Sequence, residues 1–185
     1  MVQHQHLQMV QAYCALANYG CMMQLRIVDK ITDARTGETL ESFPMQVKDR
    51  QVVSGATTVQ MTQALKTVCE TGGTAKLARY DKKGKMVIKF PVAGKTGTAQ
   101  KVVPAVKDEH GNIIQKAHYS NSLHVSSFIG YVPADNPEFV LYIVVDEPRH
   151  VKPYYYGGHA AAPSFRRISE QTLNYLNVSP KEGGE

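Results

Sequence analysis

The two apolar segments 125–131 and 139–146 limit the folds open to this chain more than any other part of it. Each has the length and the β-branched and aromatic content of a strand, and the turn residues Pro133-Ala-Asp-Asn-Pro137 separate them. They therefore predict two antiparallel neighbours in a sheet. The second segment is apolar without a break from Phe139 to Val145, which is typical of a central strand covered on both faces.

A sheet of this kind needs helices packed on it, and helical spacing of apolar residues occurs three times. The three segments are 7–18, 58–70 and a final helix that begins near Pro163. The residues expected on their buried faces are Leu7, Val10, Cys14 and Ala17; Met61, Leu65, Val68 and Cys69; and Phe165, Ile168, Leu173 and Leu176. We expect Gly20 to end the first helix and Thr57 with Gln60 to form a capping box at the second.

Two further β segments complete the predicted fold. Segment 90–100 is interrupted by glycines but extended in character, and segments 25–31 and 39–43 flank a turn-rich stretch and predict a small surface hairpin. The lengthy stretch 101–124 predicts a mobile hairpin with residues 108–112 at its tip. The fold class is therefore α+β, with three strands in an antiparallel sheet and amphipathic helices packed on it.

Composition excludes several classes of protein. With 185 residues, 43% of them apolar and 20% charged, the chain has the size and composition of one soluble globular domain. Its longest apolar run is far shorter than the roughly 20 residues that span a bilayer, and the N-terminus lacks the pattern of a signal peptide. We expect neither a membrane segment nor a signal within this chain.

The charge and the possible metal ligands point to no nucleic acid, metal or cofactor. The net charge is +5, but the densest basic patch, Lys82, Lys83 and Lys85 around Gly84, is typical of a solvated turn and has no interleaved aromatic residues. Three cysteines without C-x-x-C spacing indicate neither a disulfide framework nor a zinc site. His4 and His6 could hold a metal, but no cluster of Cys or carboxylate accompanies them.

The most informative motif is Lys95-Thr-Gly-Thr98, within the segment 92–100. On a strand, side chains alternate, so Lys95 and Gly97 point to one face while Thr96 and Thr98 point to the other. Gly97 would let a substrate backbone or a helix approach closely, and an extended peptide could pair with a free strand edge. The two threonine hydroxyls offer hydrogen-bond donors to a carboxylate.

K-T-G is one of three elements of penicillin-binding proteins and β-lactamases, beside S-x-x-K and S-x-N. Several other segments, in the same order along the chain, resemble class B penicillin-binding proteins, the D,D-transpeptidases of cell division and elongation. They are Leu7 to Gly20, Arg50 to Ser54, Glu70-Thr-Gly-Gly-Thr-Ala75, Val92 to Gln100, Ser127 to Pro137, Tyr156-Gly-Gly158 and Ala161-Ala-Pro163. The resemblance covers nearly the whole chain, from Leu7 to Leu176.

This resemblance implies acyl transfer on the cell-wall stem peptide, the reaction that β-lactams intercept by mimicking D-alanyl-D-alanine. A serine attacks that bond, D-alanine leaves, and a neighbouring amine takes the acyl group. Carried onto this chain, Lys95 would provide positive charge toward the S-x-N serine, and Thr96 and Thr98 would receive the substrate carboxylate. Gly97 would keep the cleft open, and the backbone N–H of Thr98 would be one of two oxyanion donors. The resemblance implies no cofactor.

The other two elements are missing from the printed sequence. None of its serines has a lysine three residues later, and no S-x-N occurs. Ser164 has Arg167 at that spacing, but a guanidinium stays charged and cannot act as a base. We therefore expect residues 1–185 to be the C-terminal portion of a transpeptidase domain, with an ordered core over about 7–177, and to be inactive alone.

Two hypotheses follow from the resemblance and the missing serine. In the first, the chain supplies the K-T-G strand of a peptidoglycan D,D-transpeptidase that binds stem peptides and β-lactams. Its parent would lie at the inner membrane, with this domain on the periplasmic side and a membrane glycosyltransferase of the cell-wall machinery as partner. In the second, the chain is a non-catalytic module that binds cell-wall peptide or a partner in division or elongation.

Overall fold

The computed structural model describes residues 2–148 and 153–180, without the side chains of residues 2–4. The chain forms two compact units, one up to Thr62 and one from Gln63 onward. Helix α2 (Gly55–Thr67) begins in the first unit and ends in the second. His4, considered above as half of a metal-binding pair, has its side chain outside the described residues.

The first unit contains helix α1 and two short antiparallel strand pairs. Helix α1 (Val2–Ala17) is followed by Gly20, whose φ of +91° and N–H bond to Ala15 O, 2.8 Å, end it as predicted. The expectation that Leu7 is buried is wrong, since its side chain is 51% exposed. Strand β1 (Met22–Met23) pairs with β4 (Val47–Asp49), and β2 (Lys30–Thr32) pairs with β3 (Thr39–Ser42). The predicted hairpin is thus present, with a shorter first strand than expected.

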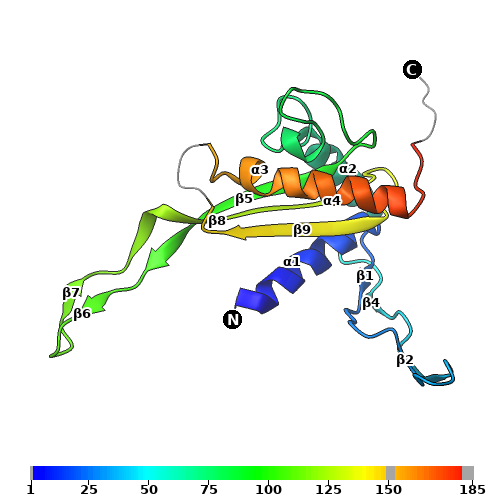
Figure 1. Ribbon diagram of the computed structural model, residues 1–185, viewed down its shortest axis with the longest axis horizontal. Coiled ribbons are helices and arrows are strands. Elements are labelled where there is room, and N and C mark those ends of the chain that lie inside the picture. The colour runs from blue at the N-terminus through cyan, green and yellow to red at the C-terminus, as the bar shows by residue number, and fades with distance from the viewer. Residues whose placement is uncertain (1, 149–152, 181–185) are drawn as a thin grey trace. The chain divides into compact units, whose positions relative to one another are not determined.

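The second unit is built on an antiparallel sheet in the order β5-β8-β9 (Figure 1). Its strands are β5 (Ala93–Val103), β8 (His118–Val132) and β9 (Phe139–Asp146). The fold class and the strand pair predicted from segments 125–131 and 139–146 are confirmed. The prediction that the second of these is central is wrong for the described residues, because β8 lies in the middle and β9 at an edge.

The burial of β9 explains why its sequence suggested a central strand. Alternate residues Phe139, Leu141, Ile143 and Val145 pack against the hydrophobic core. The residues between them point to the other face, where Val144 remains 37% exposed. An apolar run over both faces therefore marks a strand with two apolar faces and does not fix its place in the sheet.

Helix α4 (Ala162–Tyr175) covers one face of this sheet (Figure 1). Its buried stripe is Ala162, Phe165, Ser169 and Leu173, and the ring of Phe165 meets Phe128 of β8 edge-on with centroids 4.8 Å apart. Two predicted core positions are wrong, since Ile168 and Leu176 are 40% and 46% exposed. Positions spaced by three or four residues from Ala162 lie in line, and Ile168 is one position off that line.

The short helix η1 (Lys76–Ala78) adds Leu77 and Ala78 to the core, and the segment after helix α2 adds Cys69. Leu65 and Cys69 are buried as predicted, but Met61 is 41% exposed. Helix α2 begins three residues earlier than expected, because the hydroxyl of Ser54 accepts the N–H of Thr57 and provides the cap in place of Thr57. Burial raises the pKa of the Cys69 thiol to about 12.

An arm continues β5 and β8 beyond the end of β9, with β6 (Val106–Lys107) and β7 (Ile113–Gln115) toward its tip (Figure 1). The predicted hairpin is present, and its turn is closed by an Asp108 N–H bond to Asn112 O of 2.9 Å. The lysine cluster also forms the predicted turn, because the Asp81 carboxylate accepts the N–H groups of Lys83 and Lys85 at 2.8 Å each. None of the described helices combines the length and apolar character needed to cross a membrane.

Candidate active-site strand and cavity

The K-T-G segment lies on β5, an edge strand of the described sheet. Its pairing with β8 sets Lys95 opposite Ile129, Gly97 opposite Ser127 and Thr98 opposite Ser126. The other edge of β5 has no strand partner among the described residues. The backbone of β5 is therefore placed where an extended ligand could reach it.

Thr96 and Thr98 line one cavity of about 360 Å³. The alternation of side chains along β5 brings both to the same face, and Thr74 closes the cavity from the segment before η1. The other lining residues come from the loop into the short helix α3 (Gly157–Ala160) and from α3 itself: Tyr156, Gly157, Gly158 and His159.

Both threonine hydroxyls have polar neighbours. Thr98 Oγ1 accepts the backbone N–H of Gly157 at 3.1 Å, and Thr96 Oγ1 lies 3.3 Å from Thr74 Oγ1. A hydroxyl has one hydrogen to donate and two lone pairs to accept with. Because Thr98 accepts from Gly157, its own hydrogen can still be donated to a carboxylate in the cavity.

Lys95 and Gly97 are not among the residues that line this cavity. Lys95 is exposed, and its Nζ donates to the carbonyl oxygen of Thr96 at 3.2 Å. No carboxylate within the described ranges forms an ion pair with it, so its positive charge is available to another group. A Cβ on Gly97 would lie 2.6 Å from the hydroxyl oxygen of Ser127, so glycine leaves room here for that side chain.

The loop beside the cavity packs closely because two of its residues are glycines. A Cβ on Gly157 would come within 2.2 Å of the carbonyl oxygen of Ser127, and one on Gly158 within 1.9 Å of the carbonyl oxygen of Thr74. Real Cβ contacts are never this short, so only glycine allows the backbone to approach in this way. The two glycines thereby hold Tyr156 at the cavity wall.

A charged cluster lies at the base of the arm, further along the same strand. Lys101 Nζ donates to Asp146 Oδ1 at 2.9 Å and to Glu147 Oε1 at 2.7 Å. These hydrogen bonds, first that to Glu147 and then that to Asp146, raise the pKa of Lys101. The cluster ties β5 to the end of β9.

Five lining residues were not predicted as site residues: Thr74, Tyr156, Gly157, Gly158 and His159. They lie far from the K-T-G segment in sequence, and nothing in their local spacing indicates a shared cavity. A signal was nevertheless present for four of them. Thr74 belongs to segment 70–75, and Tyr156, Gly157 and Gly158 form segment 156–158, both of which carry the family resemblance.

Comparison with known proteins agrees with the resemblance. Residues 4–170 match the penicillin binding protein transpeptidase domain. The probable peptidoglycan D,D-transpeptidase PenA of Neisseria gonorrhoeae is 29% identical over 174 residues, covering 94% of this chain and 24% of the relative. Stage V sporulation protein D of Bacillus subtilis is 34% identical over 176 residues, covering 95% and 24%. The chain thus spans about a quarter of the length of these relatives.

Solved structures give the same result for the fold. Penicillin-binding protein 3 of Mycobacterium tuberculosis, solved in complex with aztreonam, is similar with a TM-score of 0.71 and 31% identity, over 95% of this chain and 36% of that one. The transpeptidase domain of Burkholderia pseudomallei penicillin-binding protein 3 has a TM-score of 0.65 and 28% identity, over 95% and 44%. The family predicted from the sequence is confirmed, and the chain belongs to the transpeptidase domain family of class B penicillin-binding proteins.

Proposed function

We propose that this chain supplies the K-T-G side of a peptidoglycan D,D-transpeptidase site, and that residues 1–185 are the C-terminal portion of that domain with an ordered core over about 7–177. The observation that carries the proposal is the cavity in which Thr96 and Thr98 present their hydroxyls from an edge strand. Membership of the family supplies the reaction class, acyl transfer from D-alanyl-D-alanine stem peptides. The ligands are such peptides and the β-lactams that mimic them.

Each residue of the segment has a role that its surroundings support. The Thr98 hydroxyl donates to the ligand carboxylate while it accepts from Gly157, and Thr96 adds a second hydroxyl beside it. Lys95, which has no carboxylate partner in the described part of the chain, provides positive charge toward the S-x-N serine. The N–H of Thr98 is one oxyanion donor, and Gly97, which has no side chain, keeps the cleft open.

The printed 185 residues contain no S-x-x-K element, so the nucleophilic serine must come from another segment. Acylation therefore requires a polypeptide that contains this element. In the parent protein we place this domain on the periplasmic side of the inner membrane. A membrane glycosyltransferase of the cell-wall machinery is the expected partner there. The same absence favours the second candidate function, a non-catalytic module that binds cell-wall peptide or a division or elongation partner.

A labelling experiment tests the assignment of the nucleophile. The purified chain, incubated with a fluorescent penicillin, is expected to take up no covalent label. Stable labelling would show that one of its serines is an active nucleophile and would refute the assignment. In a polypeptide that also carries the S-x-x-K and S-x-N elements, labelling is expected, and Lys95→Ala should sharply reduce it; labelling unchanged by Lys95→Ala would refute the role of that lysine.

A binding experiment tests the cavity in the chain itself. Titration of the ¹⁵N-labelled chain with N-acetyl-D-alanyl-D-alanine should shift the amide signals of Thr96, Thr98 and Gly157. Thr98→Val should weaken this binding, whereas Thr39→Val, which removes an exposed strand hydroxyl from β3, should leave it unchanged. Shifts confined to residues outside the cavity would contradict the proposed site.

A further inference from the structure

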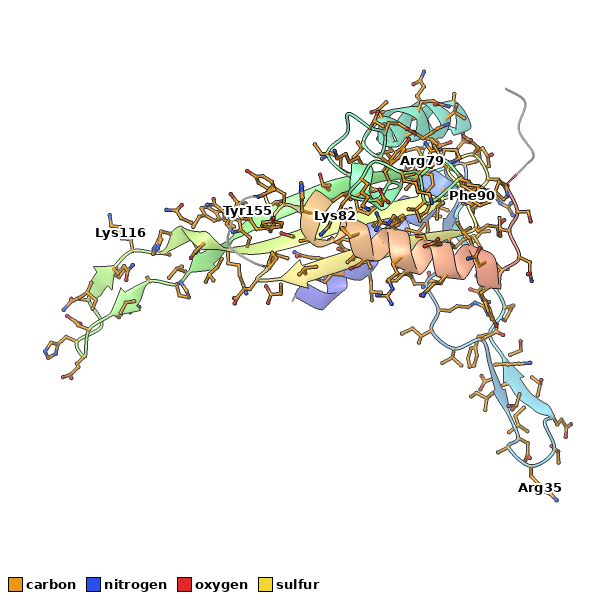
Figure 2. The ribbon with its side chains drawn as sticks, turned by 45° about the horizontal axis from the view of Figure 1, so that its top comes forward. Arg35, Arg79, Lys82, Phe90, Lys116 and Tyr155 are labelled. Atoms are coloured by element: carbon orange, nitrogen blue, oxygen red, sulfur yellow. The ribbon has the colours of Figure 1, made fainter. Side chains whose placement is uncertain are left out.

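Three aromatic rings form a continuous series of contacts that ends at the cavity. The imidazole of His124 on β8 stacks on the ring of Tyr155, with centroids 4.3 Å apart and planes within 9°. The ring of Tyr155 in turn meets that of Tyr156 at 4.7 Å and 66°. Tyr156 is a wall of the cavity that holds Thr96 and Thr98. Figure 2 labels Tyr155 near the end of the sheet from which the arm projects.

The first ring of the series is the most firmly held. His124 is only 6% exposed, its Nδ1 lies 3.3 Å from the carbonyl oxygen of Ser122, and its own carbonyl accepts the N–H of Glu147 at 2.9 Å. The Ser126 hydroxyl donates to the carbonyl oxygen of Tyr155, which attaches the loop to the same strand. The sheet thus fixes the imidazole, and the imidazole provides a flat surface for the loop.

The last ring is the least constrained by burial. Tyr156 is 41% exposed, although its backbone is anchored by the N–H of Gly157 on Thr98 and by its own N–H on the carbonyl oxygen of Pro153 at 3.0 Å. Backbone anchoring leaves the side chain free to change rotamer, so the orientation of an exposed ring depends on its ring neighbours. Here that neighbour is Tyr155, whose ring is stacked on that of His124.

We propose that His124 is a positioning residue of the ligand site: its ring orients Tyr155, and Tyr155 orients Tyr156 as an apolar wall beside the threonine hydroxyls. This wall would contact the apolar part of a ligand whose carboxylate is held by Thr96 and Thr98. The positioning itself is independent of any ligand, and its effect on affinity rests on the proposed function. The role belongs to the flat ring, because His124 and Tyr155 meet face to face with their planes within 9°.

Variants that keep or remove the ring test the proposal. His124→Phe keeps a flat ring, and His124→Asn removes it but keeps a polar group near the Ser122 carbonyl. Tyr155→Leu breaks the same contact from the loop and leaves β8 intact. His118→Asn is the matched control, because His118 is exposed on the same strand and has the same Nδ1 contact of 3.3 Å with the carbonyl two residues earlier.

The first readout needs no ligand. In NMR spectra of the free chain, His124→Asn and Tyr155→Leu should move the ring signals of Tyr156, whereas His124→Phe and His118→Asn should leave them near the wild-type positions. Tyr156 signals unchanged in both ring-removing variants would overturn the proposal. The Tyr155→Leu result keeps the test decisive if His124→Asn disturbs the fold, which circular dichroism would reveal.

The second readout is the dissociation constant for benzylpenicillin bound without acylation. Aromatic contacts of this kind correspond to about three- to tenfold in affinity, so His124→Asn should weaken binding by about that factor and His124→Phe should restore it. Weakening by His124→Phe to the same extent as by His124→Asn would overturn the role of the ring. If the wild-type chain binds no penicillin while the Tyr156 signals still move in His124→Asn and Tyr155→Leu, the proposed function fails and the positioning by His124 stands.

Discussion

Replacing Thr98 by valine tests the hydrogen bond that joins β5 to the loop before α3, which carries Tyr156. Valine has nearly the shape of threonine, so the change removes the acceptor of the Gly157 N–H and alters packing little. Gly157 is buried, and a buried donor left without a partner costs about 1–3 kcal/mol. Thr98→Val should therefore lower the free energy of unfolding by about that amount even though Thr98 itself is exposed.

The same reasoning predicts a smaller effect at the neighbouring threonine. The partner of Thr96 is the hydroxyl of Thr74, which can rotate toward water, so Thr96→Val should cost less than about 1 kcal/mol. Thr98→Ser keeps the acceptor and should be close to wild type.

Urea denaturation followed by far-UV circular dichroism measures these differences. With an m-value of about 2 kcal/mol/M, Thr98→Val should lower the midpoint by about 0.5–1.5 M. A midpoint for Thr98→Val equal to that of Thr98→Ser would refute the claim that Thr98 holds the loop. An equal loss for Thr96→Val and Thr98→Val would refute the distinction between a buried and an exposed partner.

Three further predictions concern the core and the loop. Burial raises the pKa of the Cys69 thiol to about 12 from an ordinary 9.0, so on raising the pH the thiol ionises first in the unfolded state. The free energy of unfolding should therefore fall by up to about 4 kcal/mol between pH 9 and 12, a contribution that is fully present below pH 9. Cys69→Ala should flatten this alkaline dependence of the urea midpoint, and an unchanged slope would contradict the prediction. Phe165→Ala should cost about 3–5 kcal/mol and Ile168→Ala, on the same helix, less than about 1 kcal/mol by the same assay; similar losses would count against the buried stripe of α4. Gly158→Ala should displace the loop and shift the NMR signals of Tyr156, whereas Gly72→Ala, whose added Cβ meets no atom within 4 Å, should not; a silent Gly158→Ala would contradict the close approach.

The strands and helices of the second unit were predictable because their apolar residues recur with a regular period. Segment 139–146 coincides with β9, and the final helix begins within one residue of Pro163. Residues 118–124 were predicted only as part of a separate hairpin, and their continuity with strand 125–131 in one long β8 was not predicted. Most of this ribbon is exposed, so burial imposes no alternation on its sequence.

The order of the strands in the sheet and the set of residues that line the cavity depend on contacts that local sequence does not encode. The sequence of β9 suggests a central strand because both of its faces are apolar. Its pairing with β8 alone places it at an edge of the described sheet. The roles of Lys95 to Thr98 came from the family resemblance, and they stay predictions. Thr74, Tyr156 and His159 join them only through folding, because close packing of the two loop glycines brings distant segments together.

The change from three strands to two along β8 has a consequence for how the protein opens. Residues 125–131 of β8 are paired on both sides, with β5 and with β9, whereas His118, Tyr119 and His124 are paired with β5 alone and residues 120–123 bulge out of that register. The ribbon can therefore separate without breaking the sheet, and its amide hydrogens should exchange with solvent through local opening, while those of residues 125–131 exchange only when the sheet unfolds. β8 is thus one continuous strand that spans two cooperative units, and the boundary between them falls at His124, where the stacked rings begin.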